Sequence, residues 1–504
     1  MKRKSLFLRS SVLLFSLGAL AGCGNAGGAQ DPSTVVVWVG DESVSYYRAL
    51  ADKYVAENPD FGYTIQIVGT DTGGAGAQMV NDNTACGDIV TIAHDNIGKL
   101  SRSAYIVPIV DDPNEEDDLL KQIKADNPES FLESITNILS TDTAHTYTFG
   151  APYISQALFL YYNKKYVTDE QANTFEGLLA AAKAKGGDTK ALQATGTDGF
   201  NFCYPILSRN LTNGNTTSLR LYVNGEGKDD KAVRYDSYLQ TNEEVAIMRY
   251  FQRFYKDKNG LEFTTADNPW ETAVKAEKSL AVIGGAWQYN SFKSAVDNMG
   301  CKIIPSYTLT AEDVAGIEAV TYPNDKYLPE SLRGTTDPAP QAGTVMRGGS
   351  FVDCKCFVLN AAKVAKPERY YKLCKLIKYF SSKEAQNNSY LEAFNVPAYK
   401  GSEEFIEEKK SAVDETVYLM ASAQTGMNIY GIPQPFATGA LNTYYYQKKA
   451  PDYYVDCLKN TKGDYDDVGA IRKVFFRMEY IWKHGGDPAR YPSAFPSETS
   501  TTIK

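Results

Sequence analysis

The stretch that decides the fold is residues 87–108, GDIVTIAHDNIGKLSRSAYIVP. Its residues 88–93 form a short apolar run rich in β-branched side chains, which predicts a strand, and the polar residues that follow turn the chain. Asp95 is a suitable N-cap for the helix predicted next. Ligands of open α/β sheets bind at the carboxyl ends of strands, so Asp95 and Asn96 are candidate contacts for a small polar ligand. Helix capping alone would also explain Asp95.

Strands and helices alternate in the part of the chain that precedes this stretch. The predicted order is a buried strand, a helix, a second strand and a flexible Gly-rich connection, at residues 34–39, 46–57, 63–68 and 70–77. This alternation predicts an α/β protein with a doubly wound, mostly parallel sheet. Asp41 and Glu42 directly follow the first strand, so they would open onto the same crevice as Asp95.

The N-terminus has the pattern of an export signal. Four basic residues lie among the first nine, and residues 11–20 are apolar but too few to span a bilayer comfortably. Leu-Ala-Gly-Cys at residues 20–23 resembles the bacterial lipobox, which implies cleavage before Cys23 and acylation of its sulfur, with palmitate as the expected lipid. We expect a signal peptide over residues 1–22 and a lipid-anchored flexible tether over 23–33. An ordinary signal peptide or a plain membrane anchor is the alternative.

Parts of the sequence resemble a known family. Residues 88–89, residues 93–95 and the apolar edge near Ile106 are similar to the corresponding stretch of the maltose/maltodextrin-binding proteins, which are family 1 extracellular solute-binding proteins of ABC importers. The resemblance extends over roughly residues 34–482, with further specific matches at residues 151–164, 281–287 and 432–434. It implies a two-lobed periplasmic-binding-protein-like fold of type II, in which each lobe is a mostly parallel sheet flanked by helices and a hinge joins the lobes.

The same resemblance divides the chain into lobes. We expect an N-terminal lobe at residues 34–154 and 304–382, and a C-terminal lobe at residues 155–303 and 383–484. The hinge would lie near residues 155–160. Periodicity predicts helices at residues 175–185 and 367–380, and composition predicts polar insertions at 212–238 and 321–349 and a disordered tail at 485–504.

Candidate ligand contacts combine rings with polar side chains. Flat aromatic rings stack on the apolar faces of pyranoses, while carboxylates and amides bond to their hydroxyls. The family places a sugar-stacking Trp after a Gly-rich turn, and Trp287 follows Gly284 and Gly285, although a buried structural Trp would show the same pattern. The predicted substrate-binding set is Asp41, Glu42, Asp95, Asn96, Gln156, Tyr204, Trp287 and Phe436.

The match departs from the family at several of these positions. Glu42 stands where the family often has Lys, and Asn96 stands where it often has Arg. Gly439 and Ala440 replace the paired aromatic residues of the maltodextrin binders. These differences leave the identity of the sugar open.

Charge and cysteine content exclude other classes of partner. Removing the four basic residues of the signal takes the formal net charge from −9 to −13, so we expect no nucleic-acid partner. With Cys23 acylated, seven irregularly spaced cysteines remain. Cys354 and Cys356 flank Lys355 on a predicted strand, where alternation would put both thiols on one face. With only three histidines in the chain, this pair favours small buried thiols over a zinc site, and we expect neither metal nor cofactor.

The sequence therefore predicts a binding protein and not an enzyme. It would be a monomer anchored by lipid to the extracytoplasmic face of the cell membrane, and it would deliver an oligosaccharide to the transmembrane subunits of an ABC permease. The alternatives are the same role for another glycan, a peptide or a polyamine, and a surface glycoside hydrolase, since carboxylates beside aromatic rings also describe such enzymes. The sequence shows no nucleophile elbow or HExxH motif.

Overall fold

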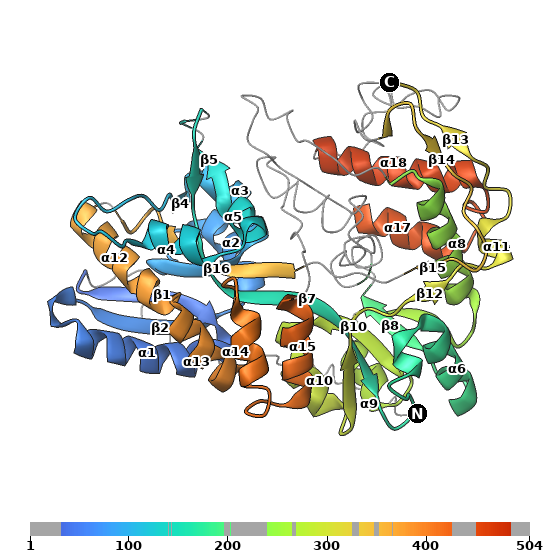
Figure 1. Cartoon of the computed structure of the whole chain (residues 1–504), viewed down its shortest axis with the longest axis horizontal. Coiled ribbons are helices and arrows are strands. Elements are labelled where there is room, and N and C mark those ends of the chain that lie inside the picture. Colours follow the sequence, from blue (N-terminus) through green and yellow to red (C-terminus); the bar gives the residue numbers. More distant parts are fainter. Residues whose placement is uncertain are drawn as a thin grey trace, which may run out of the picture.

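The computed structural model shows two groups of strands and helices on either side of two long strands (Figure 1). It describes residues 32–139, 141–142, 144–195, 202, 239–264, 269–324, 332–346, 352–364, 366–425 and 450–484. In Figure 1 the blue and orange segments form one lobe, and green, yellow and red segments form the other. The two-lobed α/β prediction is confirmed.

The sheet of the first lobe begins with three parallel strands. Strand β1 (Thr34–Gly40) lies between β2 (Thr64–Thr70) and β3 (Ile89–Ala93) and runs parallel to both. Its alternate valines, Val35, Val37 and Val39, are fully buried, as expected for a strand with one face on the core. The helices of this lobe are α1 (Val44–Glu57), α2 (Thr72–Asp82), α3 (Ile97–Arg102), α4 (Leu119–Asp126), α5 (Glu129–Ile135), α12 (Pro367–Phe380) and α13 (Lys383–Ala393).

Helix α2 begins where the sequence predicts a flexible connection. The Asp71 carboxylate accepts hydrogen bonds from the backbone N–H groups of Gly73, at 3.0 Å, and Gly74, at 3.1 Å. This N-cap satisfies two of the free donors at the start of the helix. The cap outweighs the poor helix propensity of the glycines, so the prediction of a loop over residues 70–77 is wrong from Thr72 onward.

Two strands join the lobes. Strand β7 (Ala151–Asn163) is buried along its whole length. Its first half pairs antiparallel with β16 (Val352–Asn360), which also pairs antiparallel with β3. Its second half pairs antiparallel with β10 (Ala281–Gly285) and β11 (Met299–Lys302). One sheet therefore runs through both lobes, with β7 as the shared strand.

The second lobe continues this sheet. Strand β8 (Leu192–Thr195) runs parallel to both β10 and β9 (Leu261–Thr264). The helices α6 (Phe175–Lys185), α8 (Asn242–Lys256), α9 (Trp270–Lys275), α10 (Tyr289–Ala295), α15 (Glu415–Thr425), α17 (Ala450–Lys459) and α18 (Val468–His484) belong here. Helices α17 and α18 pack on each other and on α8. Helices α6 and α12 have the bounds that periodicity predicts.

The segment that follows β11 keeps contact with elements of the second lobe. After β11, strand β12 (Tyr307–Thr308) pairs with β15 (Val345–Met346), and α11 (Ala311–Val314) contacts α8. The ring of Tyr307 packs on Tyr250, at 4.6 Å between centroids. Because these contacts join residues 307–346 to elements of the second lobe, we propose that the chain returns to the first lobe before Val352 and not at the predicted residue 304.

The contacts of α13 and α15 bear on the last crossing of the chain between the lobes. Helix α13 contacts α1 and α12, which are first-lobe elements, whereas α15 contacts β7 and β11. We therefore propose that the crossing lies between these two helices and not at the predicted residue 383. Between them, the backbone N–H of Ser155 on β7 donates to the carbonyl of Val396, at 2.8 Å.

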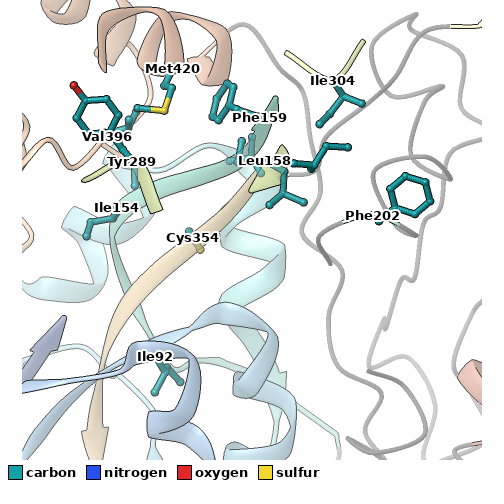
Figure 2. Close-up of a cluster of buried hydrophobic side chains, with 14 of the residues drawn as sticks. Ile92, Ile154, Leu158, Phe159, Phe202, Tyr289, Ile304, Cys354, Val396 and Met420 are labelled. Carbon is teal, nitrogen blue, oxygen red and sulfur yellow. The ribbon is translucent and has the colours of Figure 1, made fainter. Parts of the chain in front are cut away.

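Apolar packing is continuous across the hinge. Figure 2 shows side chains from both lobes around β7 and β16, from Ile92 near β3 through Ile154 and Cys354 to Tyr289 and Met420. All of them are buried. The six cysteines that the structure describes are buried free thiols. No helix in the described ranges is long and apolar enough to cross a membrane.

Candidate functional site

A hollow lies where the hinge meets both lobes. Its walls include Glu42 from the first lobe, Gln156 from β7, Trp287 and Tyr289 from the second lobe, and Phe394 from the segment between α13 and α15. Its free volume is about 40 Å³, which would admit little more than a water molecule. A larger ligand therefore requires the lobes to move apart.

Trp287 is presented to this hollow by a tight turn. The 3-10 helix η7 (Ala286–Gln288) directly follows β10, and the Gln288 side chain accepts a hydrogen bond from the backbone N–H of Gly285, at 3.0 Å. A Cβ at Gly285 would lie 2.3 Å from the indole ring, so only glycine permits this approach. The Trp287 side chain is 45% exposed. A large ring left exposed beside a hollow is typical of a binding site, not of a structural core.

Gln156, which lines the same hollow, carries an unsatisfied polar atom. The residue is 3% exposed, and its Oε1 has no hydrogen-bond partner among the residues that the structure describes. An unpaired buried carbonyl of this kind costs about 1–3 kcal/mol. A hydroxyl donor on a bound ligand would satisfy it.

The side chains of Glu42 and Asp41 have different neighbours in the structure although the two residues are adjacent in the sequence. Both lie in the 3-10 helix η2 (Asp41–Ser43) and are exposed. Glu42 lines the hollow. The Asp41 carboxylate lies over the end of β2, where a Cβ at Gly69 would be 2.2 Å from its Oδ1.

Asp95 and Asn96 are buried instead of facing the hollow. They lie in the 3-10 helix η4 (His94–Asn96) and are 6% and 5% exposed. The Asn96 side-chain amide donates to Asp95 Oδ1, at 2.8 Å, and its Oδ1 packs so closely on Gly76 of α2 that a Cβ there would be 2.4 Å away. The buried Lys99 lies within reach of the Asp95 charge.

The predicted capping role of Asp95 is not observed. Neither η4 nor α3 starts with a side-chain hydrogen bond to its backbone, and Asn96 occupies the N-cap position of α3. Burial lowers the pKa of the Lys99 ammonium, and the Asp95 carboxylate opposes this shift. Asp95 therefore stabilises a buried positive charge.

The structure brings three of the eight predicted contacts together: Glu42, Gln156 and Trp287 line one hollow. Asp41, Asp95 and Asn96 lie outside its walls. Tyr204, Phe436 and the lipidation residue Cys23 fall outside the described residues, so these predictions stay predictions.

Two aromatic wall residues, Tyr289 and Phe394, were not among the predicted contacts. Tyr289 follows Trp287 by two residues, and burial raises the pKa of its hydroxyl, which accepts a hydrogen bond from the Lys293 ammonium at 2.9 Å. Phe394 ends α13 in the left-handed region, with φ of 59°, and is 39% exposed. Such a conformation is unusual for a bulky residue. No sequence pattern marks Phe394, because neither a glycine nor a turn motif signals the conformation.

Residues 49–416 match the family model of the bacterial extracellular solute-binding proteins. The chain belongs to this family. Over 323 residues, this solute-binding protein is 26% identical to a maltooligosaccharide ABC transporter solute-binding lipoprotein of Streptococcus pneumoniae strain R6, which covers 60% of the chain and 68% of the relative. The maltodextrin-binding protein MdxE of Bacillus subtilis is 24% identical over 318 residues, covering 61% of the chain and 68% of that protein.

Solved structures agree on the fold of this solute-binding protein. The structure of MalX from Streptococcus pneumoniae in complex with maltopentaose aligns with a TM-score of 0.57 at 19% identity, covering 89% of this chain and 100% of that one. The maltodextrin-binding protein MalE1 from L. casei BL23, without ligand, aligns with a TM-score of 0.59 at 18% identity, covering 88% and 99%. Similarity at this level of identity establishes the two-lobed fold and nothing finer.

Proposed function

We propose that this solute-binding protein captures an oligosaccharide of the maltodextrin type between its lobes and delivers it to the permease of an ABC importer. The observation that carries the proposal is the exposed ring of Trp287 beside a hollow that is also lined by Gln156, whose Oε1 is unpaired in the described structure. A pyranose offers an apolar face for the ring and hydroxyl donors for the oxygen. Glu42, at the edge of the first lobe, would accept from further hydroxyls.

Ligand capture would use the hinge. The lobes are connected by β7, by the return before β16 and by the segment between α13 and α15. Small backbone rotations at such connections open and close a cleft while each lobe keeps its packing. The hollow would then correspond to a narrow form of the cleft, which widens to admit a sugar.

The similarity to named maltooligosaccharide binders supports this class of ligand. The remaining predicted contacts, Asp41, Asp95, Asn96, Tyr204 and Phe436, stay proposals. Asp95 would then have two roles, because it already stabilises Lys99. Permease recognition of the closed form and a monomeric state are also part of the proposal.

The first experiment is a thermal-shift screen of the secreted form from Gly24 onward. Maltooligosaccharides should raise its melting temperature, because a ligand that binds only the folded state stabilises it. Other oligosaccharides, peptides and polyamines complete the panel, and chromatography of the incubated sugars follows. Stabilisation by peptides or polyamines alone would overturn the choice of sugar, and shortened sugars would indicate a hydrolase.

Trp287→Ala tests the site itself. We expect it to lower sugar affinity at least tenfold, since the stacking surface is lost, with little change in the melting temperature of the free protein because the ring is half exposed. Val55→Ala is the control, since Val55 is 37% exposed, lies near the C-terminal end of α1 and is not among the residues that line the hollow. Unchanged affinity in Trp287→Ala would contradict the stacking role.

The lipid anchor needs its own test. We propose that Cys23 is acylated, which the lipobox-like residues and the name of the pneumococcal relative support. In a bacterial host, the wild-type protein should be found in the membrane fraction and label with palmitate. Cys23→Ser should release it and abolish the label, and a membrane-bound Cys23→Ser variant would contradict this anchor.

A further inference from the structure

Lys355 lies between the two flanking cysteines on β16, where the sequence drew attention only to the thiols. Its side chain is 8% exposed. No salt bridge or hydrogen bond holds its ammonium in the described part of the chain. Its Nζ lies over the ring of Trp287, 5.8 Å from the ring centroid. The contact therefore links β16 of the first lobe to η7 of the second.

The strand register places Lys355 beside the walls of the hollow. Lys355 pairs with Ile154 on β7, and Gln156 lies two residues further along the same strand. Residues that face each other across two strands share a face of the sheet, as do residues two apart. Lys355, Ile154 and Gln156 therefore lie on one face, and both β7 residues line the hollow with Trp287.

A second buried lysine shows what a structural role requires. Lys99 is also 8% exposed, and the Asp95 carboxylate favours its charged form. Burial of a cation without such a partner is unfavourable, and a ring at 5.8 Å compensates only in part. Lys355 therefore lacks the carboxylate partner that would explain its burial by structure alone.

We propose that Lys355 is a ligand contact, whose ammonium donates to an oxygen of the saccharide unit that stacks on Trp287. Gln156 Oε1 accepts from a hydroxyl of the same unit, so the floor of the cleft supplies one donor and one acceptor beside the ring. The inference rests on the proposed function and adds a specificity determinant to it. A ligand that lacks oxygen acceptors at this position should bind poorly.

The test compares lysine variants of the secreted form. Lys355→Met removes the charge and keeps an unbranched side chain that is one atom shorter. We expect its melting temperature without ligand to equal or exceed that of the wild type, while its affinity for maltooligosaccharides falls at least tenfold. Lys99→Met is the control for a structural lysine and should lower the melting temperature. Lys124→Met, on the exposed side of α4, controls for loss of charge and should change neither quantity.

The possible outcomes distinguish the proposed role of Lys355 from the proposed binding of sugar by the protein. A melting temperature for free Lys355→Met several degrees below the wild type would make Lys355 structural and overturn the inference. Unchanged sugar affinity in this variant would also overturn it, and would leave the proposed function intact. If no saccharide stabilises the wild-type protein, both the role of Lys355 and the proposed function are overturned. This outcome is distinguishable from the others because it is measured with Lys355 still present.

Discussion

Arg369 Nη2 on α12 lies 2.6 Å from Asp88 Oδ1, at the start of the stretch that decides the fold. The Asp88 side chain is 1% exposed, and its second oxygen accepts from the backbone N–H of Val36 on β1, at 2.8 Å. Arg369 also donates to the carbonyl of Thr34, at 2.9 Å. The pair therefore fastens a helix from late in the chain to the two central strands of the first lobe.

Breaking this pair should destabilise the first lobe. Asp88→Ala leaves the largely buried guanidinium of Arg369 without its carboxylate, so we expect a loss of about 3–5 kcal/mol in the free energy of unfolding. Urea titration measures the loss. The double variant Asp88→Ala/Arg369→Met also removes the unpaired guanidinium charge, so it should recover part of the lost free energy of unfolding. A single variant with wild-type stability would contradict the account.

The hairpin of β5 (Thr136–Ile138) and β6 (Thr146–Thr148) gives a prediction about pH. Hydrogen bonds from the Tyr147 hydroxyl, at 2.6 Å, and from the His145 ring lower the pKa of Asp142 from 3.8 to about 2. A depressed carboxyl pKa contributes stability that is present above the unfolded value and lost as pH falls through the folded value.

Tyr147→Phe removes the larger cause of this shift. The wild type should therefore be more stable than Tyr147→Phe at pH 5, and the difference in melting temperature should shrink as pH falls from about 4 towards 2. Thermal melts of both proteins across this range measure it. A difference that does not depend on pH would mean that the hydroxyl acts without the Asp142 charge.

Two buried glutamines offer a matched pair of variants. Gln156 in the hollow and Gln193 on β8 are 3% and 1% exposed, and both have side-chain atoms without partners in the described structure. Replacing an unsatisfied buried amide by an apolar side chain of similar size is neutral or stabilising. Gln156→Met and Gln193→Met should both keep or raise the melting temperature. Sugar-induced stabilisation should fall in Gln156→Met alone, and an equal response in the two variants would remove Gln156 from the site.

Asp95→Asn separates the structural and ligand roles of Asp95. Loss of its charge leaves the buried Lys99 ammonium poorly compensated, so we expect a loss of about 1–3 kcal/mol in unfolding free energy, measured by urea titration. Adding Lys99→Met should restore most of it, since no buried cation then remains. If Asp95→Asn instead keeps full stability and only weakens sugar binding, the ligand role predicted from sequence is its main one.

Local pattern was sufficient for the elements of the first lobe and for the turn at Trp287. The alternating valines of β1 and the periodicity of α6 and α12 depend on neighbours within one element, so the sequence shows them directly. The Gly-Gly-Ala-Trp order likewise predicts a sharp turn with a ring at the end of a strand, and only the structure shows that this ring is exposed. The resemblance to the solute-binding family extended these local matches to the two-lobed fold.

The burial of individual side chains and the crossings of the chain between the lobes could not be predicted from local sequence in the same way. Asp95 follows a strand as a ligand contact would, yet α2 and Lys99 enclose it, and neither is marked as its neighbour in the sequence. The chain stays in the second lobe after β11 because Tyr307 packs on Tyr250. Such contacts join residues far apart in the chain, and local composition carries no record of them.

The sequence alone thus determined the alternation of strands and helices and the family, and it predicted an export signal and a sugar-stacking candidate, since each depends on residues close together in the chain. Only the tertiary structure decided which candidates share a hollow and that Lys355 faces Trp287. The physical reason is the register of β7 with β16, which sets the face and the neighbours of each side chain across nearly 200 residues of intervening chain.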